Sequence, residues 1–309
     1  MVATAELPAS AIDILEAAGD VDIWRGATPI STEDLVTQVA GADALVTLVD
    51  TVVDARVLRS APRLQVVANV AVGFDNVDLA TAGELGVWVT NTPDVLTDAT
   101  ADLTMALLLA VARRVVEAEA LLRAGKFERW GFQMLLGVEL AGKTLGVVGY
   151  GRIGRAVARR AASFGMRIAH VDSSSSEAEV DALFATSDVV TLHAPATART
   201  RRMVDERRLR LMKHGAILVN TSRGALVDEA ALAGALAEGR LRGAGLDVYE
   251  NEPCVEPRLL AAPNAVLLPH IGSATTEARR AMAELAARNA VEVLAGRRPP
   301  NVVVEGRGW

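Results

Sequence analysis

The sequence Thr144-Leu145-Gly146-Val147-Val148-Gly149-Tyr150-Gly151-Arg152-Ile153-Gly154 joins an apolar run to a glycine-rich turn, and a helix-like stretch follows as far as Phe164. The first glycine of the turn permits a tight bend, the second lets the backbone approach a pyrophosphate, and the third lets the helix pack against the strand. The positive end of the helix dipole then faces the phosphates. The segment predicts a dinucleotide site; the alternative is a glycine turn that serves only packing.

An acidic residue supports the dinucleotide interpretation. A second apolar run, Arg167 to Val171, ends in Asp172, 18 residues after Gly154. A carboxylate in this position can bind a ribose 2′-hydroxyl, and it repels a 2′-phosphate. The sequence therefore predicts NAD as the cofactor, with NADH preferred over NADPH.

Apolar runs alternate with helical patterns along the chain, which is typical of parallel α/β sheets. At 309 residues the chain is long for one core, so two domains are expected. Long helical patterns cover 98–124 and 276–294, and an extended tail at 302–304 is expected to return to the first domain. The predicted strands are 21–24, 44–49, 64–68 and 87–90 in a first series and 144–148, 167–171, 188–193, 216–220, 243–246 and 266–268 in a second.

Composition argues against several classes of protein. The net charge of −6 disfavours a nucleic-acid or anionic-membrane surface, since both need a basic face. The most apolar stretch, at 105–111, is far shorter than the ~20 residues of a membrane span. Cys254 is the only cysteine, and nothing resembles a signal peptide, so we expect a cytoplasmic protein. The histidines lack the spacing of metal ligands, so no metal site is expected.

Polar residues follow several predicted strands. Ligands of open parallel sheets bind beyond the carboxyl ends of the strands. Arg223 can bind a carboxylate there through two hydrogen bonds, or pair with Asp228 instead. His270 can exchange a proton near neutral pH, or serve only the structure, and Glu252 is a candidate partner for its ring. The residues that hold such strand-end positions are Asp172, His193, Thr221-Ser222-Arg223, Asp247 and His270.

Together these motifs resemble the D-isomer-specific 2-hydroxyacid dehydrogenases, most closely their glyoxylate/hydroxypyruvate reductase branch. The resemblance covers nearly the whole chain. It is carried by the segments 69–78, 92–102, 149–154, 221–224, 243–248, 250–253 and 269–273.

The resemblance implies an α/β fold of two doubly wound parallel-sheet domains. A Rossmann NAD-binding domain, residues 99–282, is inserted in a flavodoxin-like substrate domain made of residues 1–98 and 283–309. It also implies an enzyme that reduces a small 2-oxo acid, glyoxylate or hydroxypyruvate, to the D-2-hydroxy acid and catalyses the reverse oxidation. Trp130 matches an aromatic residue that a dimer partner contributes to the site in this family, so the resemblance also implies a homodimer.

The roles of individual residues follow from the same resemblance. Arg223 would bind and polarise the 2-oxo acid, His270 would be the general acid/base, and Glu252 would support the imidazolium. The implied cofactor-binding residues are Thr104, Gly149, Gly151, Arg152, Ile153, Gly154, Asp172, His193, Ala194, Pro195, Thr200, Thr221, Ser222, Arg223, Asp247, His270 and Gly272. The implied substrate-binding residues are Leu48, Val72, Gly73, Arg223 and His270, together with Trp130 from a dimer partner.

Two departures from the family pattern leave alternatives. The segment between Asp172 and Thr186 is shorter than usual, so a strand or helix at the sheet edge is expected to be missing near the adenine end of the cofactor site. The chain ends at Trp309 without the regulatory domain of many phosphoglycerate dehydrogenases, which makes D-3-phosphoglycerate the second choice of substrate. A non-catalytic NADH-sensing protein is the alternative from another class, and the intact Arg223, Glu252 and His270 favour the enzyme.

Overall fold

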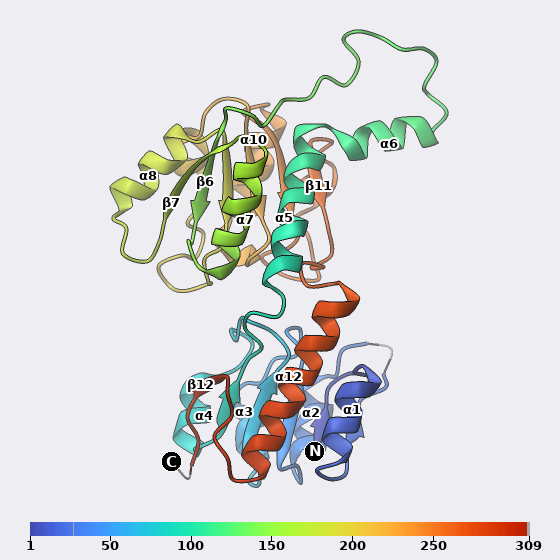
Figure 1. Ribbon diagram of the computed structural model, residues 1–309, viewed down its shortest axis with the longest axis vertical. Helices are drawn as coiled ribbons and strands as arrows, with labels where there is room; N and C mark the ends of the chain where they lie inside the picture. Colours follow the sequence, from blue (N-terminus) through green and yellow to red (C-terminus); the bar gives the residue numbers. More distant parts are fainter. Residues whose placement is uncertain (27, 308–309) are drawn as a thin grey trace. The chain divides into compact units, whose positions relative to one another are not determined.

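The computed structural model describes residues 1–26 and 28–307 and divides into two compact units (Figure 1). We call Thr97–Ser273 the central unit, and Met1–Leu96 with Ala274–Trp309 the discontinuous unit. The sequence placed these boundaries at 98/99 and 282/283. In the structure the second boundary lies at 273/274 and precedes the last long helix, Thr276–Leu294, which therefore lies wholly in the discontinuous unit, whereas a boundary at 282/283 would divide this helix. The predicted domain end at Trp309 lies outside the described residues.

The central unit is built on a six-stranded parallel sheet, as the sequence predicted. The first strand of this unit, β6 (Thr144–Val148), lies inside the sheet, the second, β7 (Arg167–Val171), forms one edge, and the later strands extend the sheet in the other direction. This reversal is the topological switch at which α/β proteins bind ligands. The strand order is β11 (Ala265–Leu267), β10 (Leu241–Leu246), β9 (Ala216–Asn220), β8 (Val189–Leu192), β6 (Thr144–Val148) and β7 (Arg167–Val171).

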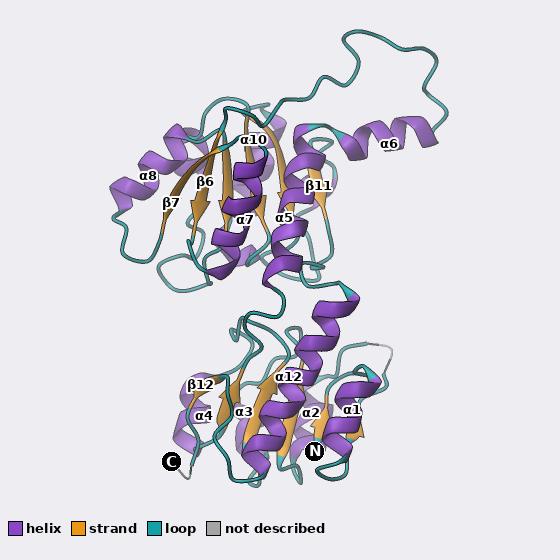
Figure 2. Cartoon of the chain, viewed as in Figure 1, coloured by secondary structure: helices purple, strands orange, loops and turns teal. Residues whose placement is uncertain are grey.

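Helices cover both faces of this sheet (Figure 2). One face packs against α5 (Thr97–Ala112) and α7 (Arg152–Ser163) through small and branched apolar residues. The other face packs against α8, α9 and α10, with Phe184 fully buried among them. Such double coverage explains why the strands are near-continuous apolar runs. The remaining helices are α6 (Val115–Arg123), α8 (Glu177–Thr186), α9 (Glu206–Leu211), α10 (Glu229–Ala237) and α11 (Pro257–Leu260).

The prediction of one long helix over 98–124 is wrong, because two helices, α5 and α6, occupy this range. The chain changes direction at Arg114, whose φ of 54° lies in the left-handed region. The guanidinium of Arg114 then binds the Glu117 carboxylate within the first turn of α6. No glycine or proline marks this break in the sequence, so helical periodicity alone runs through it.

The shortened segment after Asp172 leaves β7 as the edge strand of the central sheet. The chain passes from β7 through a serine turn directly into α8, which Ser176 and Glu179 cap reciprocally. The ring of His170, on β7, stacks on Tyr150 with ring centroids 3.8 Å apart. The edge strand is therefore covered in part by the glycine-rich turn itself.

The discontinuous unit holds a second six-stranded sheet, and its strand β12 comes from the predicted C-terminal tail. β12 pairs antiparallel with β5, whereas the other pairs are parallel. The sequence did not predict β1, which is only two residues long. The order is β12 (Val302–Val304), β5 (Trp88–Thr90), β4 (Val66–Asn69), β3 (Ala44–Thr47), β1 (Val2–Ala3) and β2 (Asp22–Ile23).

The helices of the discontinuous unit include α1 (Ala9–Glu16) and α12 (Thr276–Leu294), which lie side by side on one face of its sheet (Figure 1). The others are α2 (Thr32–Val39), α3 (Ala55–Ser60) and α4 (Leu79–Leu85). Among all the described residues, none of the helices is long and apolar enough to cross a membrane.

Candidate active site

The three predicted catalytic residues follow neighbouring strands of the central sheet. Arg223 follows β9, Glu252 follows β10, and His270 follows β11. Nδ1 of His270 lies 2.8 Å from Oε2 of Glu252. The positive charge of Arg223 is close enough to favour the ionised form of Glu252. The structure therefore brings all three to the carboxyl end of one sheet.

Glu252 is ionised although it is partly buried. Burial opposes the charge, but hydrogen bonds from His270 and from the backbone N–H of Tyr249 outweigh it and hold the pKa of this carboxyl below its usual value. The Tyr249 N–H donates to Oε1 over 2.9 Å, so each carboxylate oxygen has its own partner. A carboxylate at Nδ1 fixes the ring tautomer and favours the imidazolium. Nε2 of His270 is then the atom that can exchange a proton with a ligand.

Asp247, at the end of β10, holds the turn that carries His270. Its side chain is fully buried, and its two oxygens accept hydrogen bonds from the N–H groups of Ile271 (2.8 Å) and Gly272 (2.7 Å). Its carbonyl oxygen accepts from the N–H of His270 over 2.8 Å. Burial raises the pKa of Asp247, while the two backbone amides oppose that rise. His270 has a φ of 53°, a conformation that a non-glycine residue keeps only where its surroundings enforce it.

The sequence assigned Asp247 to cofactor binding, and the structure gives its carboxylate a clear task in shaping the catalytic turn. Gly272, also assigned to the cofactor, is one of the two amides that Asp247 binds.

The three glycines of the turn after β6 have distinct surroundings. Gly149 has a φ of 92°, and a Cβ there would lie 2.6 Å from the backbone of His193. A Cβ on Gly154 would lie 2.2 Å from the carbonyl oxygen of Gly149. At Gly151, the N-cap of α7, no atom lies within 4 Å of such a Cβ. Close packing within the chain therefore requires glycine at the first and third positions. The second glycine instead leaves open space beside the N-terminus of α7, which begins with Arg152 and Ile153.

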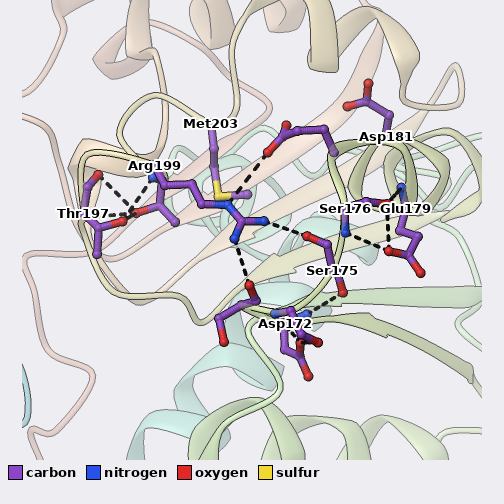
Figure 3. Close-up of polar contacts among 12 residues, drawn as sticks. Asp172, Ser175, Ser176, Glu179, Asp181, Thr197, Arg199 and Met203 are labelled. Carbon is purple, nitrogen blue, oxygen red and sulfur yellow. Dashed lines mark hydrogen bonds and ion pairs between the residues drawn. The ribbon is translucent and has the colours of Figure 1, made fainter.

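Asp172 lies at the far end of this site, in a turn of serines (Figure 3). Its Oδ1 accepts from both the hydroxyl (2.7 Å) and the N–H (2.9 Å) of Ser174, which lower the pKa of the Asp172 carboxyl. The hydroxyl of Ser175 accepts from the N–H of Asp172. These bonds hold the carboxylate charged and leave Oδ2 outside the Ser174 contacts. This geometry suits an acceptor for the hydroxyls of a ribose.

Arg199 ties the serine turn to the loop after β8 (Figure 3). Its guanidinium donates to the carbonyl oxygens of Ser173 (2.8 Å) and Ser175 (2.6 Å). Nothing in the local pattern of the segment 199–210 predicts this contact. Thr200 closes its own loop by donating to the carbonyl oxygen of Pro195 over 2.6 Å. One arginine therefore joins the predicted ribose site to the loop of predicted cofactor-lining residues.

The other predicted lining residues lie around the same end of the sheet. His193 and Ala194 follow β8, and burial lowers the pKa of His193 to about 3, so its ring is neutral at physiological pH. Its Nε2 lies 3.0 Å from the Thr191 hydroxyl. The hydroxyls of Thr104, on α5, and Thr221, after β9, are 2.8 Å apart and buried. Ser222, beside Arg223, binds Asn220 through both its N–H and its hydroxyl.

The predicted substrate residues Leu48, Val72 and Gly73 belong to the discontinuous unit. Leu48 follows β3 and lines a cavity of about 340 Å³. Val72 and Gly73 follow β4, where the side-chain amides of Asn91 and Asn69 donate to their carbonyl oxygens, each over 2.8 Å. In a trans peptide the next N–H points opposite to the carbonyl, so the N–H groups of Gly73 and Phe74 face away from these asparagines.

Trp130, the predicted partner residue, lies in a long connection between α6 and β6 that projects from the central unit (Figure 1). Its side chain is 72% exposed, and it packs edge-to-face against Phe132, which is 77% exposed. Phe127 and Leu136 are also exposed in this segment, which we call the arm (residues 124–138).

Comparison with known proteins identifies relatives of the whole chain. The model of the D-isomer specific 2-hydroxyacid dehydrogenase NAD binding domain matches residues 105–272. Glyoxylate reductase of Thermococcus litoralis is 48% identical over 314 residues, which cover 97% of this chain and 95% of that protein. Glyoxylate reductase of Pyrococcus furiosus is also 48% identical over 314 residues, with 97% and 94% covered.

Solved structures match equally broadly. A Thermus thermophilus protein of 49% identity superposes with a TM-score of 0.93 and covers 98% of this chain and 99% of its own. An NADPH-dependent glyoxylate/hydroxypyruvate reductase of Sinorhizobium meliloti, solved with NADP and malonate, is 32% identical with a TM-score of 0.87, covering 100% and 98%.

The surroundings of Gly151 and Gly154 predict opposite effects of the same substitution. Gly151→Ala is expected to retain the wild-type free energy of unfolding and to weaken NADH binding, because its methyl group enters the open space beside α7. Gly154→Ala is expected to lower stability, because its methyl group meets backbone. Urea unfolding and NADH fluorescence titration measure the two effects. Equal stability and equal NADH affinity in the two variants would show that the glycines have been misassigned.

Proposed function

The chain belongs to the D-isomer-specific 2-hydroxyacid dehydrogenase family, and we propose that it reduces glyoxylate, hydroxypyruvate or a similar small 2-oxo acid to the D-2-hydroxy acid and catalyses the reverse oxidation. Near-full-length similarity to glyoxylate reductases supports this class of oxidoreductase. The observation that carries the proposal is the contact of His270 with Glu252 at the sheet end that also bears Arg223. The central unit is the family's NAD-binding domain.

In the proposed reaction the nicotinamide supplies or accepts a hydride, and the protein handles the proton. During reduction His270 donates the proton at Nε2 to the substrate oxygen as negative charge develops there. Glu252 holds Nδ1, so it keeps Nε2 as the donor and stabilises the charged ring. During oxidation the same nitrogen accepts the proton. Arg223 binds the carboxylate of the substrate and polarises its oxo group.

Backbone N–H groups near Val72 and Gly73 are proposed to bind the substrate carboxylate. The hydrogen bonds from Asn91 to the Val72 carbonyl and from Asn69 to the Gly73 carbonyl support this role, because each leaves the following N–H facing away from its asparagine. A row of N–H groups pointing one way is a known means of binding anions. We also propose a cytoplasmic location, on the basis of the single cysteine.

The substrate proposal predicts NADH oxidation with one or more small 2-oxo acids. Glyoxylate, hydroxypyruvate, pyruvate and 3-phosphohydroxypyruvate are compared at 340 nm with wild type and His270→Ala. The variant is expected to lose about a thousandfold in turnover, because the acid/base is gone, while the Kd for NADH stays within about twofold of wild type. Turnover of 3-phosphohydroxypyruvate alone would indicate phosphoglycerate dehydrogenase. NADH binding without turnover of any substrate would favour the sensing alternative.

We propose that NADH is preferred over NADPH. The ionised Asp172 repels a 2′-phosphate, and its serine turn holds the charge in place. The relative solved with NADP shows that a member of the family can bind the phosphorylated cofactor.

Asp172→Ser is therefore expected to raise the ratio of kcat/KM for NADPH to that for NADH by about 10- to 100-fold, equivalent to about 1–3 kcal/mol of repulsion removed. Asp20→Ser, which removes an exposed acid from the discontinuous unit, is the control for net charge and is expected to leave the ratio unchanged. A ratio that does not rise in Asp172→Ser would place the selectivity elsewhere.

We further propose that the protein is a homodimer and that the arm takes part in its interface. Monomeric proteins rarely expose a contiguous aromatic cluster, and Trp130 and Phe132 are among the most exposed large apolar residues described. Light scattering is expected to give twice the chain mass of 32.5 kDa.

Replacing both Trp130 and Phe132 by serine is expected to shift the mass toward one chain and to lower turnover. Phe164→Ser removes a 45% exposed phenylalanine outside the arm and is expected to leave the mass unchanged. A wild-type mass of one chain would overturn the dimer, and a dimer in the double variant would exclude the arm.

A further inference from the structure

Glu229 is a buried carboxylate that the proposed reaction does not use. It is the first residue of α10 and is 7% exposed. Its Oε1 accepts from the N–H of Glu250 over 2.6 Å, and its Oε2 accepts from the N–H of Glu256 over 3.2 Å. A buried charge needs such partners, and charge-assisted hydrogen bonds to backbone amides are strong ones. Sequence patterns assign no function to Glu229, because its partners are backbone atoms distant in the chain.

The two amides that Glu229 binds lie on either side of Glu252. We call residues 249–256 the glutamate loop. One oxygen of Glu229 fixes the loop before Glu252, and the other fixes it after Glu252. Within the loop, the N–H of Cys254 donates to the carbonyl oxygen of Asn251 over 2.8 Å. One carboxylate therefore closes the segment on which Glu252 lies.

The conformation of the glutamate loop decides what Glu252 can bind. The Tyr249 N–H donates to Oε1 of Glu252, which leaves Oε2 directed at Nδ1 of His270. A shift of the backbone at Tyr249 and Glu250 relative to Glu252 would change the hydrogen bond from the Tyr249 N–H to Oε1. A rotation of the Glu252 side chain would break the contact of Oε2 with His270. The pair with His270 thus depends on a loop without regular secondary structure, and Glu229 supplies two of its anchors.

Three further contacts hold the same loop in place. The hydroxyl of Tyr249 donates to the carbonyl oxygen of Leu268, two residues before His270, over 2.8 Å. A Cβ on Gly224 would lie 1.8 Å from the carbonyl carbon of Tyr249, so the turn after Arg223 rests directly on the loop. The Glu250 carboxylate binds Arg202 on the surface at 2.9 and 3.1 Å. Of these anchors, the Glu229 carboxylate is the one that binds two backbone amides of the loop.

We propose that Glu229 is a positioning residue that clamps the glutamate loop and thereby keeps Glu252 in contact with His270. The proposal rests on the proposed acid/base role of His270. The two carboxylate oxygens of Glu229 bind the backbone of the loop. Its effect passes through the backbone amides of Glu250 and Glu256 and then through the Glu252 side chain.

The charged and titratable groups around this path are few. His270 faces Glu252 and the buried Asp247. Glu252 also interacts with Arg223. The groups around the clamp itself are Tyr249, Glu250 with Arg201 and Arg202, Asp228, and Glu256 with Arg258.

Glu229→Gln tests the clamp, because the amide keeps one acceptor oxygen and turns an N–H₂ group toward the second backbone N–H. With glyoxylate and NADH, kcat is expected to fall about 10- to 100-fold while the KM for NADH stays within about twofold. Reduction declines at high pH as the imidazolium is lost, and the midpoint of this decline is expected to move to lower pH, as in Glu252→Gln. The double variant Glu229→Gln/Glu252→Gln is expected to show no further shift, because the clamp acts through Glu252.

Glu256→Gln is the matched control. This substitution removes a carboxylate from the same loop, but that carboxylate binds Arg258. The substitution retains the backbone N–H of residue 256, which Glu229 binds. Its kcat and pH midpoint are expected to match those of wild type. If Glu229→Gln does not fold by circular dichroism, Glu229→Asp keeps the charge and withdraws the oxygens by one methylene, and the same shift of smaller size is expected.

A readout without turnover separates this proposal from the proposed function. The chain has four histidines, so the ring signals of His270 can be assigned in NMR spectra by comparison with His270→Ala. The midpoint of the His270 titration is expected to fall in Glu229→Gln even if no tested 2-oxo acid is reduced. An unchanged midpoint in a folded variant, or additive effects of Glu229→Gln and Glu252→Gln, would overturn the clamp. Absence of turnover in wild type would instead count against the proposed function.

Discussion

The buried carboxylate of Asp247 is the constraint on which the geometry of the proposed catalytic residues depends. It accepts hydrogen bonds from two successive amides after His270, and this fixes a left-handed residue at the end of β11. An uncompensated charge in this position would be strongly destabilising. The turn must therefore keep both amides directed at Asp247, and His270 has little freedom to move. The ring then needs only one further contact, that with Glu252, to leave Nε2 as the nitrogen of the proposed proton transfer.

Much of the fold follows from the sequence because its causes are local. Buried parallel strands are apolar runs, so 144–148, 167–171 and 216–220 were predicted with the bounds that the structure shows. β1 was missed because two residues have no periodicity, and the break at Arg114 was missed because arginine carries no turn signal. The contact of His270 with Glu252 was predicted from the chemistry of a strand-end histidine and from the resemblance of the whole chain to a known family. Glu229 and Arg199 were not, because each binds backbone atoms of a loop whose path cannot be read from local pattern.

At the predicted adenosine end of the cofactor site, β7 is the edge strand of the sheet, and side chains hold the loop that follows it. An edge strand leaves its neighbouring loops with fewer backbone partners. Here serine side chains bind the backbone and carboxylate of Asp172, and Arg199 binds two carbonyl oxygens of the same turn. A planar guanidinium suits this task, since it donates two hydrogen bonds in a fixed geometry. Side chains thus hold Asp172, the acid proposed to select the cofactor, where a further strand would otherwise hold it.

Asp247 and Glu229 each bind two backbone amides of a loop near the proposed site. Loop amides near a ligand site cannot be paired within a sheet, and burying them unpaired is costly. A carboxylate has two oxygens and can bind two such amides at once, so one buried side chain fixes the ends of a turn. A hydroxyl can accept as well, but it lacks the charge that makes each bond strong. Because both carboxylates come from or next to regular elements, β10 and α10, they transfer the rigidity of those elements to the residues that carry the proposed chemistry.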